Sequence, residues 1–282
     1  MGIISTKQIV AMSCAVLFTL VMISPLTSHA ASHPLSDVTS YKVYYDAPTT
    51  RLITKMKQYD VMIIEPVYYS KQQISEIKSS GTKVYGYINT MEADNWNTAL
   101  INQLNEDDFF HRNGERVHYT EWDSYLTDIT SVHYRDVLLS EVTEQIADKG
   151  LDGVFLDTVG DIDNEHWENP TVLQAQQEGM VTFLQQIKQE HPSLSLIQNW
   201  GFQTLKNYTS PYVDAIMWEN FNYSTVSKDE WSNDRMADLK DIQQETNLAV
   251  FTVSTEQKWK SISYAESNGF IHFHTRNGYN SW

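Results

Sequence analysis

Eight short apolar segments, separated by stretches with helical spacing, constrain the fold more than any other feature of the chain. The segments are rich in β-branched and aromatic residues and cover 41–45, 61–64, 83–88, 153–156, 194–197, 215–218, 248–253 and 270–273. Apolar residues recur at helical spacing between most of them, in 71–80, 132–149, 172–190 and 228–245. Strands that alternate with helices form a parallel sheet with helical crossovers. The pattern therefore predicts an α/β fold, a (β/α)8 TIM barrel.

Two stretches depart from a regular alternation of strand and helix. Residues 90–130 form a long connection in which 125–129 has the character of a ninth strand, so we expect an inserted loop or hairpin after the third strand. The connection 199–214 is short. An open, doubly wound sheet is the alternative architecture, although no glycine-rich dinucleotide-binding loop follows the first strand.

The first 30 residues have the layout of a secretory signal peptide. Lys7 precedes the uncharged run 9–23, and the small-residue site Ser28-His29-Ala30 follows it. The run has about 15 residues, whereas a membrane-spanning helix needs roughly 20. We therefore expect cleavage after Ala30, secretion without a membrane anchor, and one domain over residues 31–282.

Acidic residues dominate the charge of the chain. There are 36 Asp and Glu against 20 Lys and Arg, a formal net charge of −16. Nucleic acid and anionic membranes would be repelled, whereas a cationic substrate would be attracted. An acidic secreted protein of any function accounts for the same charge. No heptad pattern predicts an oligomer, so we expect a monomer, and no motif predicts a cofactor or a metal.

A polar side chain follows each predicted strand. These residues are Asp46, Glu65, Asn89, Asp157, Asn199, Glu219, Ser254 and His274. In a barrel they converge on the C-terminal face, where active sites lie. One polar residue at a strand end is ordinary because turns favour it, but eight together with several carboxylates indicate a functional site.

Asp157 and Glu219 are the candidate catalytic residues. Hydrolysis of a glycosidic bond requires one carboxyl group that protonates the leaving oxygen and one that acts as nucleophile or activates water. We assign Asp157 as nucleophile or base. Glu219 is the candidate general acid, because the flanking Trp218 and Phe221 give an apolar setting that raises a carboxyl pKa. The distance between the two groups decides whether the reaction retains or inverts the anomeric configuration.

Aromatic residues are frequent near the strand ends, in a chain with eight Trp and 16 Tyr. Their rings can stack on pyranose faces, although packing in the core is the alternative interpretation. Trp218 should point away from Glu219, since adjacent side chains of a strand face opposite sides, so Trp200 is the better platform. The predicted substrate-binding residues are Asp46, Glu65, Tyr87, Asn89, Glu92, Asn199, Trp200, Tyr223 and His274.

Five motifs resemble a known family. They are D-G-V-F-L-D-T at 152–158, Y-D-V-M-I-I-E-P at 59–66, K-V-Y-G-Y-I-N at 83–89, I-Q-N-W-G-F at 197–202 and A-I-M-W-E-N at 215–220. In this order they are similar to endo-α-1,4-polygalactosaminidase-like glycoside hydrolases, over roughly 41–275. The resemblance implies a (β/α)8 barrel that cuts α-1,4-linked galactosamine polymers internally, with Asp157 and Glu219 as its acids. The chain departs from the family at Glu65, where Asp is expected, and in 89–92, which lacks the usual glycine.

Three other functions are compatible with a barrel. A chitinase-like enzyme would need a glutamate at Val159, which argues against that mechanism. His272 and His274 lie two apart on one strand face, as in a metal-dependent polysaccharide deacetylase or hydrolase. A catalytically inactive carbohydrate-binding barrel is the third possibility.

Overall fold

Eight parallel strands form the centre of the computed structural model, which describes Met1 and residues 33–282. The strands are β1 (Tyr41–Tyr44), β2 (Val61–Ile64), β3 (Lys83–Asn89), β9 (Gly153–Asp157), β10 (Ser195–Asn199), β11 (Ala215–Trp218), β12 (Ala249–Ser254) and β13 (Ile271–His274). Each pairs with the next one in this order. The predicted strands agree with these to within two residues, and the (β/α)8 class is confirmed. The predicted signal peptide lies outside the described residues.

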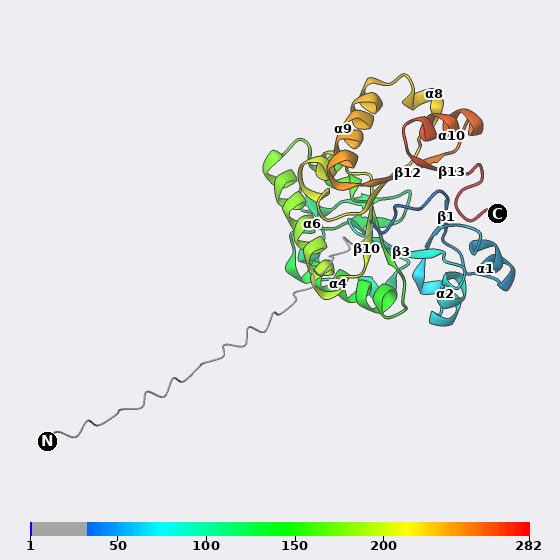
Figure 1. The fold of residues 1–282 in the computed structure, drawn as a ribbon. Helices are drawn as coiled ribbons and strands as arrows, with labels where there is room; N and C mark the ends of the chain where they lie inside the picture. Colours follow the sequence, from blue (N-terminus) through cyan, green and yellow to red (C-terminus); the bar gives the residue numbers. More distant parts are fainter. Residues whose placement is uncertain (2–32) are drawn as a thin grey trace. The chain divides into compact units, whose positions relative to one another are not determined.

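The barrel is closed between β1 and β13 mainly by side chains. The two strands are in contact, and Tyr41 in β1 donates its hydroxyl hydrogen to the Thr252 carbonyl at 2.7 Å. The ring of Tyr41 also packs edge-on against Phe251 and Phe273. After β13 the chain runs beside β1 to its C-terminus (Figure 1). The C-terminal residues therefore lie along the seam of the barrel.

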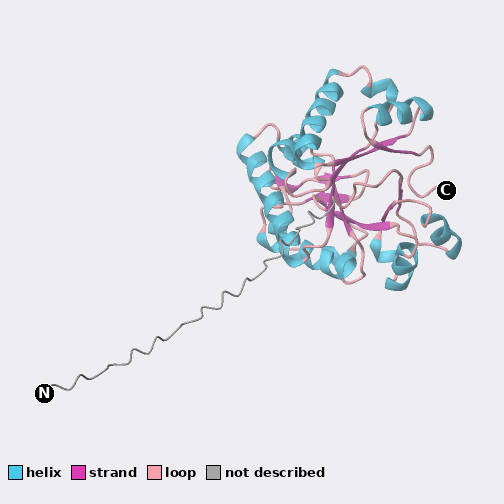
Figure 2. Cartoon of the chain, in the orientation of Figure 1, coloured by secondary structure: helices cyan, strands magenta, loops and turns pink. Residues whose placement is uncertain are grey.

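Helices surround the strands (Figure 2). The longer ones are α1 (Thr50–Met56), α2 (Lys71–Lys78), α4 (Val132–Glu141), α5 (Gly160–His166), α6 (Pro170–Glu190), α9 (Glu230–Thr246) and α10 (Lys258–Ser267). Short helical turns are η1 (Pro66–Tyr68), α3 (Thr98–Ile101), η2 (Glu106–Asp108), α7 (Phe202–Thr204) and α8 (Tyr223–Val226), and π-helical turns are η3 (Val142–Ala147) and η4 (Leu205–Thr209). All four predicted helices are present.

Side-chain caps define where several of these helices begin. Thr49, Ser70, Ser131, Asn169 and Asp229 each accept a hydrogen bond from a backbone N–H in the first turn of the helix that follows. Such caps satisfy N–H groups that have no partner within the helix. Among the helices of the described residues, none is long and apolar enough to cross a membrane.

The segment between β3 and α4 forms two small antiparallel sheets. One contains β4 (Glu92–Asp94), β8 (Ser124–Leu126) and β7 (His118–Tyr119), and the other contains β5 (His111–Arg112) and β6 (Glu115–Arg116). The candidate ninth strand at 125–129 overlaps β8. Because β8 pairs antiparallel with β4, it is separate from the barrel sheet.

Alternating side chains divide the core into two layers. Phe155, Ile197 and Met217 belong to the cluster inside the barrel, whereas Trp218 belongs to the cluster between strands and helices. Side chains two residues apart on a strand face the same side. The residues two positions after each inward one therefore face the mouth of the barrel, and Trp218 points away from it, as predicted.

Aspartates stabilise the opposite, N-terminal end of the barrel. Asp152 accepts from the Val84 N–H at 2.8 Å and contacts Lys78 Nζ at 2.9 Å. Asp214 accepts from the Leu196 N–H at 2.8 Å. Each aspartate precedes its own strand and binds the backbone of the neighbouring strand, so Asp152 is structural, as we interpreted it.

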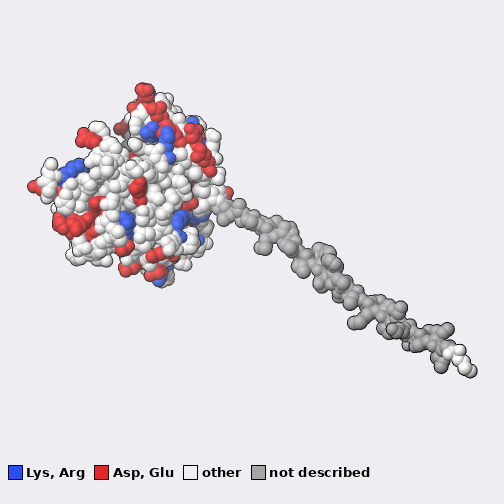
Figure 3. Space-filling view, turned by 90° about the vertical axis from the view of Figure 1, so that its left-hand side faces the viewer, with Lys and Arg blue, Asp and Glu red and all other residues white. Residues whose placement is uncertain are grey.

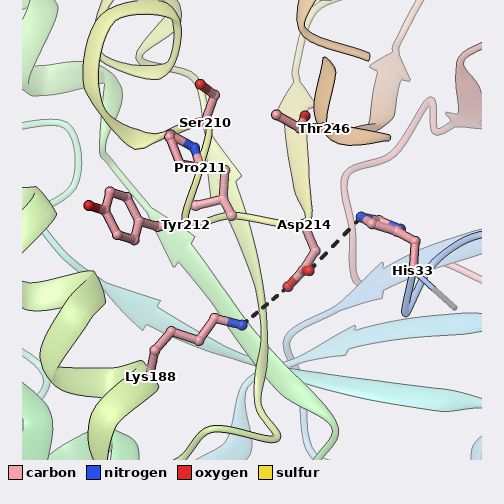
Figure 4. Close-up of a pocket in the computed structure, with 8 residues that line it drawn as sticks. His33, Lys188, Ser210, Pro211, Tyr212, Asp214 and Thr246 are labelled. Atoms are coloured by element: carbon pink, nitrogen blue, oxygen red, sulfur yellow. Dashed lines mark ion pairs between the residues drawn. The ribbon is translucent and has the colours of Figure 1, made fainter. Parts of the chain in front are cut away.

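A pocket of about 470 Å³ also lies at this end and includes Asp214 (Figure 4). Asp214 contacts Lys188 at 3.5 Å and His33 at 3.9 Å. Its carboxylate is thus occupied by a backbone N–H and two basic side chains. The pocket is at the far end of the barrel from the strand-end carboxylates.

Replacing Asp152 by alanine is expected to destabilise the fold by about 1–3 kcal/mol, because the buried Val84 N–H loses its acceptor. Urea unfolding of the purified variant measures the change. Asp148→Ala is the control, since that aspartate is exposed and surface substitutions usually change stability by less than about 0.5 kcal/mol. An Asp152→Ala midpoint equal to that of the unmodified protein would contradict the role.

Candidate active site

Three adjacent strands bring Asp157, Asn199 and Glu219 together at the mouth of the barrel. Asn199 ends β10, which lies between β9 and β11 in the sheet. Its amide nitrogen donates to Asp157 Oδ1 at 2.6 Å and to Glu219 Oε2 at 3.0 Å. One side chain therefore bridges the two predicted catalytic carboxylates.

Each of these three residues is followed by a non-glycine residue in the left-handed region. The φ angles are 60° at Thr158, 55° at Trp200 and 58° at Asn220. Such conformations cost about 1–3 kcal/mol each and concentrate at functional sites. At Thr158 the surroundings compensate: its hydroxyl oxygen accepts from the Met91 N–H at 2.9 Å and lies 2.7 Å from Asn89 Oδ1. The backbone is therefore held so that three side chains point into the mouth.

The environment raises the pKa of both carboxyls. Burial raises the pKa of Asp157, and hydrogen bonds from Asn199, Thr158 and Tyr87 oppose the increase. For Glu219, burial and then the negative charge of Asp157 raise the pKa. Because the charge of one carboxyl raises the pKa of its neighbour, such a pair loses its two protons in separate steps.

The aromatic residues that we expected to raise the pKa of Glu219 are not the cause. Trp218 and Phe221 pack against each other in the cluster behind the strand. Glu219 belongs to the opposite face. Its raised pKa therefore depends on burial in the mouth and on Asp157.

Three tyrosines form one side of the site. The ring of Tyr45 lies edge-on to Tyr87 at 5.1 Å and to Tyr279 at 5.6 Å. The Tyr279 hydroxyl donates to Glu219 Oε1. Burial raises the pKa of all three hydroxyls well above the ordinary value, so they remain protonated donors. Only Tyr87 was predicted as a site residue.

Buried and half-buried acids form the wall on the side of β2, β3 and β4. Asn89 donates to Asp94 at 2.9 Å, and Glu92 accepts from the Ser124 hydroxyl. Burial raises the pKa of Glu65 to about 8 and that of Asp94 to about 6. Part of this acidic wall is therefore uncharged at pH 7. Asp94 was missed, although Glu92 in the same small strand β4 was predicted.

Asp161 was also missed as a neighbour of these acids. It lies in the first turn of α5, where the sequence has no helical pattern. Burial and then the charge of Glu92 raise its pKa, and Asp157 adds to the increase. The carboxyl of Asp161 is thus close enough to Asp157 for the charge of Asp157 to raise its pKa.

Three of the eight strand-end residues do not face the mouth. On β1 the inward residues are Tyr41 and Val43. Continued alternation places Asp46 on the outward side, and this residue is exposed. Ser254 and His274 likewise follow the inward Val253 and Phe273. The prediction that all eight side chains converge on the mouth was therefore wrong. Because adjacent side chains of a strand face opposite sides, five of the eight face the mouth and three do not.

Two predicted aromatic residues pack against their surroundings instead of the carboxylates. Trp200 stacks on Trp231, with ring centroids 6.1 Å apart. Tyr223 lies edge-on to Tyr264 at 5.6 Å and beside the Lys260 ammonium group. Among the predicted binding residues, Tyr87 and Asn199 donate hydrogen bonds to Asp157. Asn89 accepts from the hydroxyl of Thr158, the residue after Asp157.

The histidine pair is held by hydroxyl groups. Ser254 Oγ lies 2.8 Å from His272 Nε2 and 2.9 Å from His274 Nδ1, and Thr252 Oγ1 lies 2.8 Å from His272 Nδ1. Burial lowers the pKa of His272 to about 4. Within residues 33–282, no group of three or more His, Cys, Asp or Glu side chains is arranged to hold a metal ion.

A barrel that holds two carboxyls side by side at its C-terminal face has the groups that acid and nucleophilic catalysis on a glycosidic bond requires. The protein is a glycoside hydrolase. More particularly, the chain belongs to glycoside-hydrolase family GH114, whose model matches residues 26–275. The family resemblance of the sequence motifs is thereby confirmed.

Solved structures share the fold at low sequence identity. The glycoside hydrolase domain of PelA from Pseudomonas aeruginosa has a TM-score of 0.68 and 16% identity, covering 86% of this chain and 97% of that domain. Ega3 of Aspergillus fumigatus, solved in complex with galactosamine, has a TM-score of 0.64 and 16% identity over 86% and 93% of the two chains. An α-galactosidase from Thermus thermophilus follows at 0.56 and 11%, over 87% and 59%. No curated protein sequence matches the chain.

Proposed function

We propose that the protein is a secreted, monomeric glycoside hydrolase that cleaves α-1,4-linked galactosamine-containing exopolysaccharide internally. The observation that carries the proposal is the amide-bridged pair of Asp157 and Glu219. Membership of GH114 and the likeness to Ega3, solved with galactosamine, support the substrate class. Release by signal-peptide cleavage after Ala30 is part of the proposal.

In the proposed mechanism, Asp157 attacks the anomeric carbon while Glu219 protonates the leaving oxygen. Hydrogen bonds from Asn199 and Thr158 stabilise the charged form of Asp157, as a nucleophile requires. Glu219 keeps its proton because burial and the charge of Asp157 raise its pKa. Water then enters, Glu219 takes its proton, and the sugar is released from Asp157.

We infer that the reaction retains the anomeric configuration. The two carboxylate oxygens each lie within 3.0 Å of the same Asn199 nitrogen. These two facing oxygens are therefore less than 6 Å apart. Such a short gap supports the carboxyl separation of about 5–5.5 Å found in retaining enzymes over the roughly 6.5–9.5 Å that inverting enzymes need for a water.

The acidic character of the molecule supports a cationic polymer as substrate. Acidic side chains lie in several groups on the face seen in Figure 3, and the chain has a net charge of −16. The amines of a deacetylated galactosamine polymer are protonated near neutral pH. Such amines would favour the ionised form of wall acids such as Glu65 and Asp94, so binding and ionisation reinforce each other.

The test is incubation of the purified protein with α-1,4-linked galactosamine oligomers, followed by mass spectrometry. We expect shortened oligomers from internal cleavage. Fully N-acetylated oligomers of the same length are the matched substrate control and should react more slowly if charge guides binding. Binding without any shorter product would instead favour the carbohydrate-binding alternative.

Removal of divalent metals is expected to leave the rate of cleavage unchanged, within about twofold. The reason is that His272 and His274 are engaged by Ser254 and Thr252, and the proposed steps use carboxyl groups only. The measurement is the rate before and after exhaustive dialysis against EDTA. A loss that zinc restores would favour the metal-dependent deacetylase or hydrolase.

A further inference from the structure

The last seven residues, 276–282, which we name the strap, contribute a side chain to the site although they lie outside the family match. That match ends at residue 275. The strap turns at Gly278, with φ of 76°, where the carbonyl accepts from the Thr275 hydroxyl at 2.6 Å and the Ser281 hydroxyl at 2.9 Å. The turn directs Tyr279 towards the mouth.

Polar contacts fix the strap to β1 and to the residue after it. Lys42 Nζ donates to the Ser281 carbonyl at 2.7 Å, and the Tyr45 N–H donates to Asn280 Oδ1 at 2.9 Å. Lys42 is 3% exposed, so its ammonium group depends on this carbonyl for a buried partner. The strap is therefore held by the first strand of the barrel.

Aromatic contacts hold the end of the strap. The Trp282 ring packs against Tyr44 at 5.9 Å and Tyr59 at 6.0 Å. The Lys42 and Lys55 ammonium groups lie 4.9 and 5.3 Å from its centroid. Contacts on both sides of residue 279 thus limit where its side chain can go.

Tyr279 reaches Glu219 from this fixed backbone. Its ring stacks on Phe273 at 6.5 Å and meets Tyr45 edge-on at 5.6 Å. Its hydroxyl donates to Glu219 Oε1, while Glu219 Oε2 accepts from Asn199. Each oxygen of the Glu219 carboxyl consequently has its own donor, and the plane of the carboxyl is defined.

We propose that the strap makes Tyr279 a positioning residue, which orients the Glu219 carboxyl and adjusts the pH at which it loses its proton. The part of this inference that concerns rate rests on the proposed function. The ionisable groups that face Glu219 are Asp157, Tyr41, Tyr45 and Tyr279. Asp157 favours the protonated form of Glu219, whereas the Tyr279 hydroxyl favours the ionised form. Tyr41 and Tyr45 remain neutral because burial raises their pKa.

Tyr279→Phe is the direct test, since it removes the hydroxyl and keeps the ring. As Glu219 gives its proton to the leaving oxygen, its carboxyl becomes charged, and the Tyr279 hydroxyl stabilises that charge. Loss of a hydrogen bond to a charged group lowers a rate by about tenfold or more, so kcat should fall about tenfold. KM should change little. The alkaline limb of the pH–rate profile should move up by about one pH unit, because the donor that favours ionised Glu219 is gone. Tyr212→Phe is the matched control: its hydroxyl also has one partner, Gln185 at 2.9 Å, but it lies at the far end of the barrel.

A measurement without substrate separates this inference from the proposed function. Titration of the ¹³C-labelled Glu219 carboxyl by NMR, assigned with Glu219→Gln, should show a higher pKa in Tyr279→Phe and no change in Tyr212→Phe. Trp282→Ala, which leaves the Tyr279 hydroxyl in place but loosens the strap, should give a smaller increase. An unchanged pKa and an unchanged alkaline limb in Tyr279→Phe would overturn the inference. Absence of galactosamine cleavage with a shifted pKa would overturn the proposed function only.

Discussion

Replacing Asp157 by asparagine is expected to lower kcat by a factor on the order of 10⁴ or more, as loss of a nucleophile does in other enzymes. The amide has the size of the carboxylate but cannot attack the anomeric carbon. The Asn199 side chain still finds an oxygen acceptor at this position, so the site keeps its shape. The measurement is the initial rate on galactosamine oligomers under saturating substrate.

The same substitution should not weaken the fold. Burial raises the pKa of Asp157, so its ionised form is less favourable in the folded than in the unfolded protein. That cost is absent below the unfolded pKa and grows as the pH rises towards the folded pKa. At pH 7 Asp157→Asn is therefore expected to be at least as stable as the unmodified protein, which urea unfolding measures.

Asp152→Ala is the matched control, because Asp152 lies just before the other end of the same strand, β9. Its loss should lower stability and leave kcat nearly unchanged under conditions where the variant is folded. Retention of more than about a tenth of kcat in Asp157→Asn would contradict the nucleophile role, since it is far above the residual rate expected without a nucleophile.

The alternation of side chains explains which parts of the site could be predicted from the sequence. Glu65, Asn89, Asp157, Asn199 and Glu219 each lie two residues after an inward apolar residue. Their place in the mouth follows from where each strand ends and from the alternation of side chains along it. The same rule excludes Asp46, Ser254 and His274, so their orientation could have been predicted once the strand ends were known.

Contacts between distant segments could not be predicted. Tyr279 lies 60 residues from Glu219 in the sequence, in a segment with neither helical nor strand periodicity. Trp200 had the expected position after its strand, but Trp231 at the start of α9 covers it as a stacking partner. Such contacts depend on how helices and termini pack on the barrel, about which local patterns give no information.

The protonation of the acids in the wall also could not be predicted from the sequence. Glu65 and Asp94 read as charged side chains, yet burial raises their pKa to about 8 and 6. Burial is a tertiary property. The acidic wall thus carries a charge that depends on pH and on a bound cation, whereas the net charge of −16 treats every acid as ionised.

Replacing Glu219 by glutamine is expected to lower kcat on galactosamine oligomers by about 10²–10⁴-fold, the usual contribution of a general acid. The leaving group of a sugar polymer is an alcohol, which departs slowly without a proton. An aryl glycoside with an acidic phenol needs no such help. Its first step should therefore be slowed far less by Glu219→Gln, whereas Asp157→Asn should lose activity on both substrates.

The pH dependence gives a second readout of the same variant. In the unmodified enzyme, the rate should fall as the pH rises through the raised pKa of Glu219, because the acid loses its proton. It should also fall as the pH drops through the pKa of Asp157, because the nucleophile becomes protonated. Glutamine cannot ionise, so the alkaline limb should disappear while the acidic limb remains. If instead Glu219→Gln slowed both substrates equally and removed the acidic limb, Glu219 would be the nucleophile, and Asp157, the carboxyl on the other side of the Asn199 amide, would be the acid.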